Sequence, residues 1–201
     1  MSISAAYATA AAYRAAIGKT DPADDAEILI DLTAVSRHLD AKLGRFFTRD
    51  AAPVNRVYIP AGAGPELWTD DLSAAPTGVA IDTTRNGTFA TALLSRDYEL
   101  LPLNALREPE PRPHNCIRLV PWGGRTIFPA GVRVRVTAQF GWPAVPPAVQ
   151  QATVHITALL RLETPRATRR IPELGEAIEA SPDAQRIIRQ LTDQYKLVKY
   201  V

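Results

Sequence analysis

The chain has 201 residues, and its 23 Lys and Arg residues nearly balance its 21 Asp and Glu residues, which gives a formal net charge of +2. Hydrophobic residues make up 46% of the sequence and charged residues 22%, as in an ordinary globular protein with room for a core. This balance argues against a dedicated nucleic-acid-binding protein, which usually has a strongly basic face. The single cysteine, Cys116, excludes an internal disulfide and a multi-cysteine metal site.

No apolar run is long enough to span a bilayer, and the N-terminus lacks the pattern of a signal peptide. We therefore expect a soluble product of the cytoplasm with no membrane partner. The 17 prolines fall at the ends of predicted elements and in loops. This placement indicates fixed corners between rigid pieces.

Two helices are predicted in residues 1–52. The Ala-rich stretch SAAYATAAAYRAAIG favours a helix that stops at Gly18. The second helix is expected to begin at Asp21-Pro22, a cap residue followed by proline at the first helical position. Its apolar residues recur at steps of three and four and form one stripe, consisting of Ile28, Leu32, Val35, Leu39, Leu43 and Phe46.

Residues 53–143 change to the two-residue period of β-strands. Short runs rich in β-branched residues are separated by Gly, Pro and Asn, and the pair Asn86-Gly87 favours a tight hairpin turn. In VRVRVTAQF the valines are expected to face the core, with Arg133 and Arg135 on the outer face. Asp70-Asp71 is interpreted as part of a turn.

A stiff corner follows the last predicted strand. Gly141, Trp142 and Pro143 precede Pro146, and a core helix then occupies the rest of residues 144–165. We interpret these four residues as a structural joint that fixes where the chain leaves the β-rich insertion, with Trp142 wedged between sheet and helix. The C-terminal residues 166–201 are predicted to form an arm that ends in a helix from about Ser181.

The predicted fold class is therefore α+β. A mainly helical core carries a sandwich-like β-sheet insertion between its second and third helices, and an extended C-terminal arm ends in a helix.

The sequence contains few residues arranged for catalysis or metal binding. His38, His114 and His155 stand at no metal-ligand spacing, and Cys116 has no neighbour that would activate it as a nucleophile. We see no phosphate-binding glycine loop and no nucleophile elbow. We therefore expect no catalytic residue, no cofactor and no metal.

Local charge is less even than the total. Arginines outnumber acids by four between residues 107 and 142, which indicates either a solvated sheet face or a surface that meets an acidic partner or passing DNA. Basic residues, among them Arg169 and Arg170, also gather at the start of the C-terminal arm. Such an arm can dock on another protein or be a simple tail.

Several stretches resemble one known family, the head–tail connector (adaptor, head-completion) proteins of long-tailed phages and gene transfer agents. VSRHLDAKLGRFF is similar to a family helix followed by Gly-Arg-aromatic, here at 44–46. YELLPLNA at 98–105 and IFPAGVRVRVTAQFGWPAVPPAVQQATVHITALL at 127–160 resemble the last strand, the Gly-Trp-Pro corner and the following helix. The resemblance covers about residues 5–163.

The resemblance implies a non-enzymatic virion protein of the neck, assembled in the bacterial host cytoplasm. Such connectors form a ring, commonly dodecameric, under the portal protein, and DNA passes through the ring without specific binding. The other side of the ring receives the stopper or tail protein. The C-terminal segment reaches the portal, so the candidate portal-binding residues are Arg169, Arg170, Ile187, Ile188, Leu191, Tyr195 and Tyr200.

Arg133 and Arg135 are candidates for a contact between subunits or with the channel. The alternative function is a β-sheet virion module that binds carbohydrate or protein, which exposure of Trp68 and Trp122 would favour.

Overall fold

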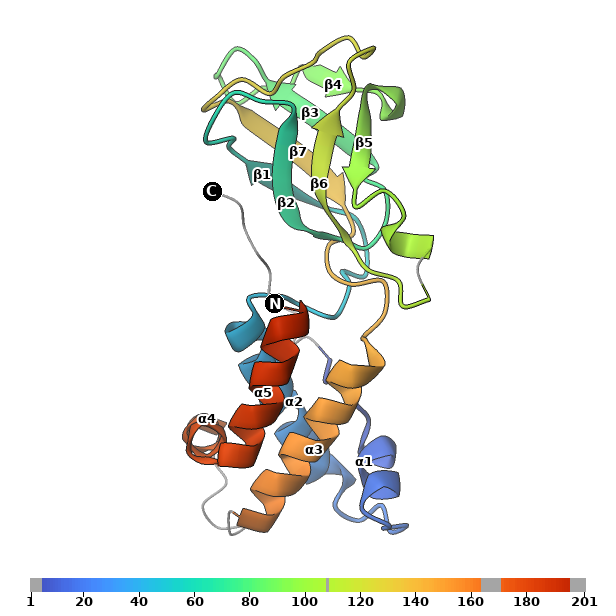
Figure 1. Ribbon diagram of the computed structural model, residues 1–201, viewed down its shortest axis with the longest axis vertical. Helices are drawn as coiled ribbons and strands as arrows, with labels where there is room; N and C mark the ends of the chain where they lie inside the picture. The colour runs from blue at the N-terminus through green and yellow to red at the C-terminus, as the bar shows by residue number, and fades with distance from the viewer. Residues whose placement is uncertain (1–4, 108, 164–170, 196–201) are drawn as a thin grey trace. The chain divides into compact units, whose positions relative to one another are not determined.

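A computed structural model describes residues 5–107, 109–163 and 171–195 (Figure 1). The predicted α+β class is confirmed, because these residues form five α-helices and two antiparallel sheets. The chain divides into two compact units. Of these residues, 5–48, 145–163 and 171–195 form a helical unit, and 49–107 and 109–144 form a β unit. The sequence placed these boundaries at 52/53 and 143/144.

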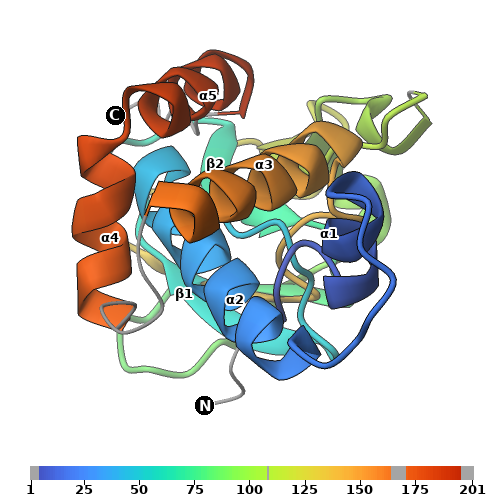
Figure 2. The same ribbon diagram turned by 90° about the horizontal axis from the view of Figure 1, so that it is seen from below.

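The helical unit is built around two long helices. These are α2 (Asp25–Leu43) and α3 (Pro147–Glu163), which cross and pack against each other (Figure 2). The short α1 (Ala10–Ala16) lies beside them and begins at Thr9, whose side-chain oxygen accepts a bond from the Ala12 amide. The remaining helices are α4 (Ile171–Ala180) and α5 (Pro182–Tyr195).

Both ends of α2 differ from the prediction. Asp21 does not cap the helix, because its carboxylate accepts a bond from the Ala23 amide in a turn that precedes Asp25. The helix ends at Gly44 in the left-handed conformation, at φ 64°. The change of direction turns Phe46 outward, 58% exposed, and buries Phe47 completely. The predicted stripe is therefore correct from Ile28 to Leu43 and wrong at Phe46.

Phe47 lies at the centre of an aromatic cluster. Its ring packs edge-to-face on Tyr7 and on Tyr195, with 5.6 Å between ring centroids in each pair. Arg45 donates from Nη1 to the Tyr195 carbonyl at 3.0 Å. The end of α5 is thus fixed to the chain that follows α2.

The predicted terminal helix from about Ser181 is confirmed by α5, whereas the extended arm predicted before it is wrong for residues 171–180. Those residues form α4, and both α4 and α5 pack on α2, while α5 also packs on α3. The apolar face of α5 is buried in the unit through Ala184, Ile188, Leu191 and Tyr195. Because burial of large apolar side chains is strongly stabilising, α5 is part of the core.

The β unit contains seven strands in two antiparallel sheets. One sheet has the order β1-β7-β3-β4 and the other the order β2-β6-β5. Apolar residues of both sheets share one buried core, so the unit is a sandwich as predicted (Figure 1). The strands are β1 (Val54–Tyr58), β2 (Glu66–Leu72), β3 (Gly78–Asp82), β4 (Thr91–Leu93), β5 (Tyr98–Leu101), β6 (His114–Leu119) and β7 (Arg133–Ala138). Single 3₁₀ turns, η1 (Ser95–Asp97) and η2 (Ala105–Arg107), precede and follow β5.

Strand β7 is one of the two inner strands of the larger sheet, paired with β1 and with β3. Its alternation agrees with the prediction, since Val134, Val136 and Ala138 are buried while Arg133 is exposed. The predicted tight hairpin at Asn86-Gly87 is replaced by a longer loop. There the buried Asp82 carboxylate accepts bonds from the Asn86 and Gly87 amides at 3.2 and 2.9 Å.

A polar cluster is buried beside the aromatic cluster. The Tyr7 hydroxyl donates to the Asp40 carboxylate and accepts a bond from the Phe47 amide at 3.0 Å, and Arg37 lies 2.9 Å from the same carboxylate. Burial raises the pKa of Asp40 from its ordinary value to about 6, against the opposing effects of Tyr7 and Arg37. The folded chain therefore holds a proton on Asp40 more tightly than the unfolded chain does.

This raised pKa predicts a pH-dependent stability. The contribution of Asp40 protonation to the free energy of unfolding is fully present below the ordinary pKa of Asp40. It is lost as pH rises through about 6. In Asp40→Asn this dependence is absent, so the free energy of unfolding of the natural chain relative to the variant should fall by about 1–2 kcal/mol between pH 4 and pH 7.5. Urea titrations across this range measure the difference. A difference that stays constant with pH would contradict the prediction.

Candidate functional site

The predicted joint begins with a glycine that the backbone requires. Gly141 has φ 106°, a conformation that other residues rarely adopt, and its amide donates to the Asp71 carbonyl at 2.8 Å. Trp142 is buried, and its Nε1 donates to Asp71 Oδ2 at 3.1 Å. Asp71 lies in β2, so two consecutive residues of the corner are fixed to the same strand residue.

The segment that enters the β unit is bonded to the segment that leaves it. The Asp50 amide donates to the Phe140 carbonyl at 2.8 Å, and the Phe140 amide donates to Asp50 Oδ2 at 3.3 Å. Gln139 Nε2 donates to the carbonyls of Asp50 and Ala51. These bonds hold the two segments side by side at one end of the sandwich.

Arg56 reinforces this end of the unit. Its guanidinium lies 4.1 Å from the centroid of the Phe140 ring and pairs with Asp70 at 2.9 Å and Asp50 at 3.4 Å. Asp70 also accepts a bond from the Tyr58 hydroxyl at 3.0 Å. The interpretation of Asp70-Asp71 as a turn was wrong, because both residues lie in β2 and bind partners from distant parts of the chain.

The other two predicted joint residues precede α3, Pro143 by four residues and Pro146 directly. Pro143 is half-buried and Pro146 is buried. The Pro146 carbonyl accepts a bond from the Gln150 amide at 3.0 Å, which makes it the first acceptor of the helix. The missing amide proton of Pro147 is not needed at this position.

The candidate portal-binding residues do not form one surface. Ile188, Leu191 and Tyr195 are buried against the helical unit. Of the candidates on this helix, only Ile187 is half-exposed. Ile188, Leu191 and Tyr195 therefore cannot serve as exposed anchors while α5 stays folded in place, which corrects the prediction. Arg169, Arg170 and Tyr200 lie outside the described residues.

Arg133 and Arg135 lie on the outer face of the larger sheet. Arg133 is exposed, and the Arg135 guanidinium lies 4.7 Å from the centroid of the Phe89 ring. Arg135 lies opposite Val57 in β1 and Ala80 in β3, and Arg133 lies opposite Asp82 in β3. The two arginines are thus separate from the C-terminal helices, since they belong to the β unit.

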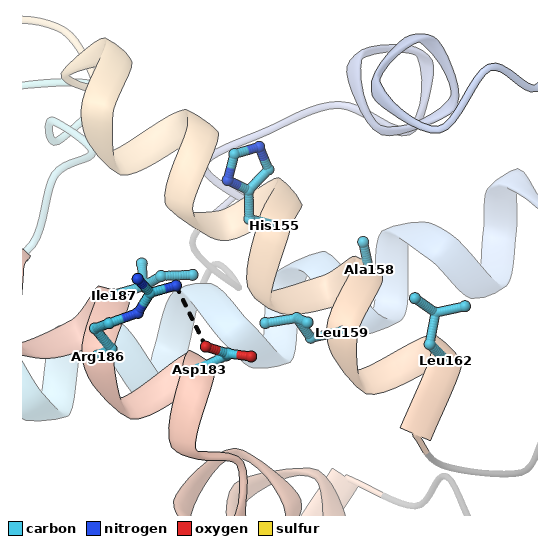
Figure 3. A pocket seen from close by; sticks show the side chains of 7 residues that line it. All are labelled: His155, Ala158, Leu159, Leu162, Asp183, Arg186 and Ile187. Carbon is cyan, nitrogen blue, oxygen red and sulfur yellow. Dashed lines mark hydrogen bonds and ion pairs between the residues drawn. The ribbon is translucent and has the colours of Figure 1, made fainter.

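A groove between α3 and α5 was not predicted (Figure 3). Its apolar lining comes from Ala158, Leu159, Leu162 and Ile187, and its polar rim from His155, Asp183 and Arg186. Leu162 is 84% exposed. The only sequence signal for the groove was the helical spacing of apolar residues on each helix. The sequence does not show that α3 packs against α5, so the groove could not be predicted.

One end of the sandwich carries exposed apolar side chains on loops, which we call the loop end. Trp122 is 80% exposed, and Ile59, Leu94 and Ile127 are also exposed. Hydrogen bonds join loop 120–132 to its neighbours, among them two between Phe128 and Gly64. Others link three more parts of the unit to the loop. They run from the Val120 amide to the Asp97 carbonyl, from Arg85 to the Ala130 carbonyl and from the Gly131 amide to the Pro60 carbonyl. Trp68, the other tryptophan considered, is half-buried in β2.

The residues considered for chemistry occupy structural positions. Cys116 is buried in β6, and burial raises the pKa of its thiol to about 12. His114 Nδ1 lies 2.9 Å from the Pro102 carbonyl, and His38 lies beside Glu179 at 3.6 Å. Among the described residues, no group of three or more His, Cys, Asp or Glu side chains could hold a metal ion. None of the helices in this part of the chain has the length and hydropathy of a membrane span.

Substitution of Gly141 by Ala tests the joint. The left-handed backbone disfavours a Cβ, so we expect the variant to lose about 1–3 kcal/mol of unfolding free energy. Gly124→Ala is the matched control, because its backbone is not left-handed and an added Cβ would meet no atom within 4 Å. Thermal and urea unfolding of both variants measure the loss. Equal stabilities of the two variants would show that the corner imposes no strain.

Comparisons with known proteins give one informative result. No family model matches the sequence, and no curated protein matches it. Among solved structures, a chain from the neck of an empty GTA (gene transfer agent) particle, computed with C6 symmetry, matches with a TM-score of 0.56 and 17% sequence identity. The match covers 97% of this chain and 92% of that chain, so the two chains share their fold over almost their whole length.

Proposed function

We propose that the chain is a structural head–tail connector in the neck of a tailed phage or gene transfer agent particle. The observation that carries the proposal is the fold shared with a chain of a particle neck over 97% of the sequence. The resemblance of the corner and the following helix to connector proteins supports the same function from the sequence. In this proposal the chain acts without catalysis.

The proposed assembly is a ring beneath the portal, most simply a dodecamer, that extends the DNA channel and receives the stopper or tail protein. The C6 symmetry used for the neighbour's particle is compatible with such a ring. A closed ring needs contacts in which one face of each subunit fits a different face of the next. The hydrogen-bonded corner around Asp71 suits a part that must keep its shape under load.

The portal contact is proposed at the C-terminal segment in a revised form. Arg169, Arg170, Ile187 and Tyr200 remain candidate contacts. Ile188, Leu191 and Tyr195 instead hold α5 in the helical core. Deletion of residues 166–201 would therefore damage the core itself and could not isolate portal attachment.

Arg133 and Arg135 are proposed to face a neighbouring subunit or the DNA in the channel. A channel through which DNA slides should not bind it tightly. This is compatible with two arginines, of which Arg133 lies opposite the acidic Asp82 in β3.

Removal of the gene from a particle-producing genome tests the proposed function. We expect heads that hold no tail, because the neck would lack the ring that joins them. A copy of the gene supplied in trans should restore tailed particles. Electron micrographs of purified particles give the readout. Normal tailed particles made without the chain would contradict the proposal.

A second candidate function is a β-sheet module of the virion that binds carbohydrate or protein, and the exposure of Trp122 favours it. We expect Trp122→Ala to abolish any binding of host surface polysaccharide that the natural chain shows in calorimetry. Leu103→Ala is the control, since Leu103 is also an exposed apolar residue (59%) but lies in a loop at the other end of the sandwich. No polysaccharide binding by the natural chain, or equal binding by both variants, would exclude a role for this surface in glycan recognition.

A further inference from the structure

We propose that the helical unit carries the two halves of a contact between copies of this chain. One half is the outer face of α2, which we call the α2 stripe. The other half is the groove between α3 and α5. The inference rests on the proposed ring and names the surfaces through which its subunits meet.

The α2 stripe is an apolar helix face with no covering element among the described residues at its centre. Leu29 is 49% exposed and Ile30 is 54% exposed. Ala26, Thr33 and Ala34 are spaced three and four residues from these two, so all five share one side of the helix. The side chains of this stripe are small or apolar, which allows another helix or a ridge of side chains to approach closely.

The α3–α5 groove is apolar at its base. Leu159 and Ile187 line it from the two helices, and Leu162 stands at its open end (Figure 3). A Leu side chain that is 84% exposed next to other apolar side chains leaves much apolar surface in water. A groove of this kind fits an inserted pair of apolar side chains, such as Leu29 and Ile30.

The stripe and the groove lie on opposite sides of the helical unit. Leu32, Val35 and Leu39 form the buried face of α2 and lie opposite Ile30 on the helix. On α3, Val149, Ile156 and Leu160 are buried, while His155 and Leu162 face the groove. Figures 1 and 2 show α3 and α5 together on one side of α2. A head-to-tail contact needs this placement, because a subunit must bind one neighbour on each side.

Most of the charged residues near the start of the stripe are acidic, whereas those beside the groove are mostly basic. Asp21, Asp24 and Glu27 lie at the start of α2, and the Glu27 side chain is 57% exposed and lies 3.9 Å from Arg161. The one cation on the stripe's own face, Arg37, lies beyond Ala34 and pairs with Asp40. Arg186 and Arg189 lie beside the groove with one acid, Asp183, and the Arg186 side chain is 67% exposed. Opposite charges around apolar centres favour one register of two copies and disfavour stripe-to-stripe pairing.

Complementation between two variants tests this contact. Ile30→Asp damages only the stripe and Leu162→Asp only the groove, and both positions are exposed enough for the charge to leave the fold intact. By sedimentation the natural chain should associate as its concentration rises, while each variant alone should stay monomeric. An equal mixture of the two should form dimers and nothing larger, because only one intact stripe can then meet one intact groove.

The control is Leu103→Asp, which changes an exposed leucine of the β unit and should associate like the natural chain. Association of either Ile30→Asp or Leu162→Asp at the natural level would overturn the proposal. Failure of the mixture to form dimers would also overturn it, because each mixture retains one complete contact. Circular dichroism of each variant confirms that it is folded.

Cysteine cross-linking gives a second measurement. The chain contains only Cys116, which is buried, so new cysteines can be studied in the natural background. Oxidation of the double variant Ile30→Cys with Leu162→Cys should give a ladder of linked chains, and neither single variant should give it. A natural chain that stays monomeric at every concentration, together with a double variant that does not cross-link, would overturn the contact.

The contact and the proposed function can fail separately. If gene removal leaves tailed particles unchanged while the complementation succeeds, the chain self-associates outside a neck. If gene removal abolishes tails but Ile30→Asp and Leu162→Asp both restore them, the chain is a neck protein whose subunits meet through other surfaces.

Discussion

The hydrogen bonds that close the β unit on itself are the constraint on which the rest of the architecture depends. Asp71 receives the Gly141 amide through its carbonyl and the Trp142 indole through its carboxylate, and Asp50 pairs with Phe140 across the same end. An insertion of nearly one hundred residues can sit within a helical unit only if the chain leaves it close to where it entered. At this end of the sandwich, Arg56 stacks on the Phe140 ring and pairs with Asp50 and Asp70. The end is therefore held by several weak interactions that reinforce one another.

The helical unit depends on a different cluster that joins both ends of the chain. Phe47 follows α2, Tyr7 precedes α1, and Tyr195 ends α5, and the Phe47 ring packs on both tyrosine rings. The C-terminal helix is therefore needed for the fold as well as being near a proposed partner. Any partner that binds the described residues of α5 must use its outward side around Arg186 and Ile187, or must release the helix at the cost of its buried side chains.

Sequence patterns predicted the long helices and the alternating strand β7, because burial of one face imposes a clear period.

The predictions failed where a residue distant in the sequence decides the local structure. Asp70 and Asp71 read as a turn, yet Arg56, Tyr58 and Trp142 satisfy their carboxylates within β2. Phe46 fitted the apolar stripe predicted for α2. Because the helix ends at Gly44, Phe46 is exposed and Phe47 is buried instead. Helix α4 carries Pro172 and Gly175, which locally disfavour a helix, and its packing on α2 outweighs that preference. Of the candidate surfaces, the corner was found from its glycine and prolines, whereas the groove and the loop end required the three-dimensional pairing of elements.

The central claim, that this chain is a connector of a particle neck, is tested most directly by the mass of its complex with a portal ring. The purified chain would be mixed with the portal protein encoded beside it and the products weighed by native mass spectrometry. The account predicts a defined complex with one copy of this chain for each portal subunit. Absence of any complex at high concentrations of both proteins would contradict it.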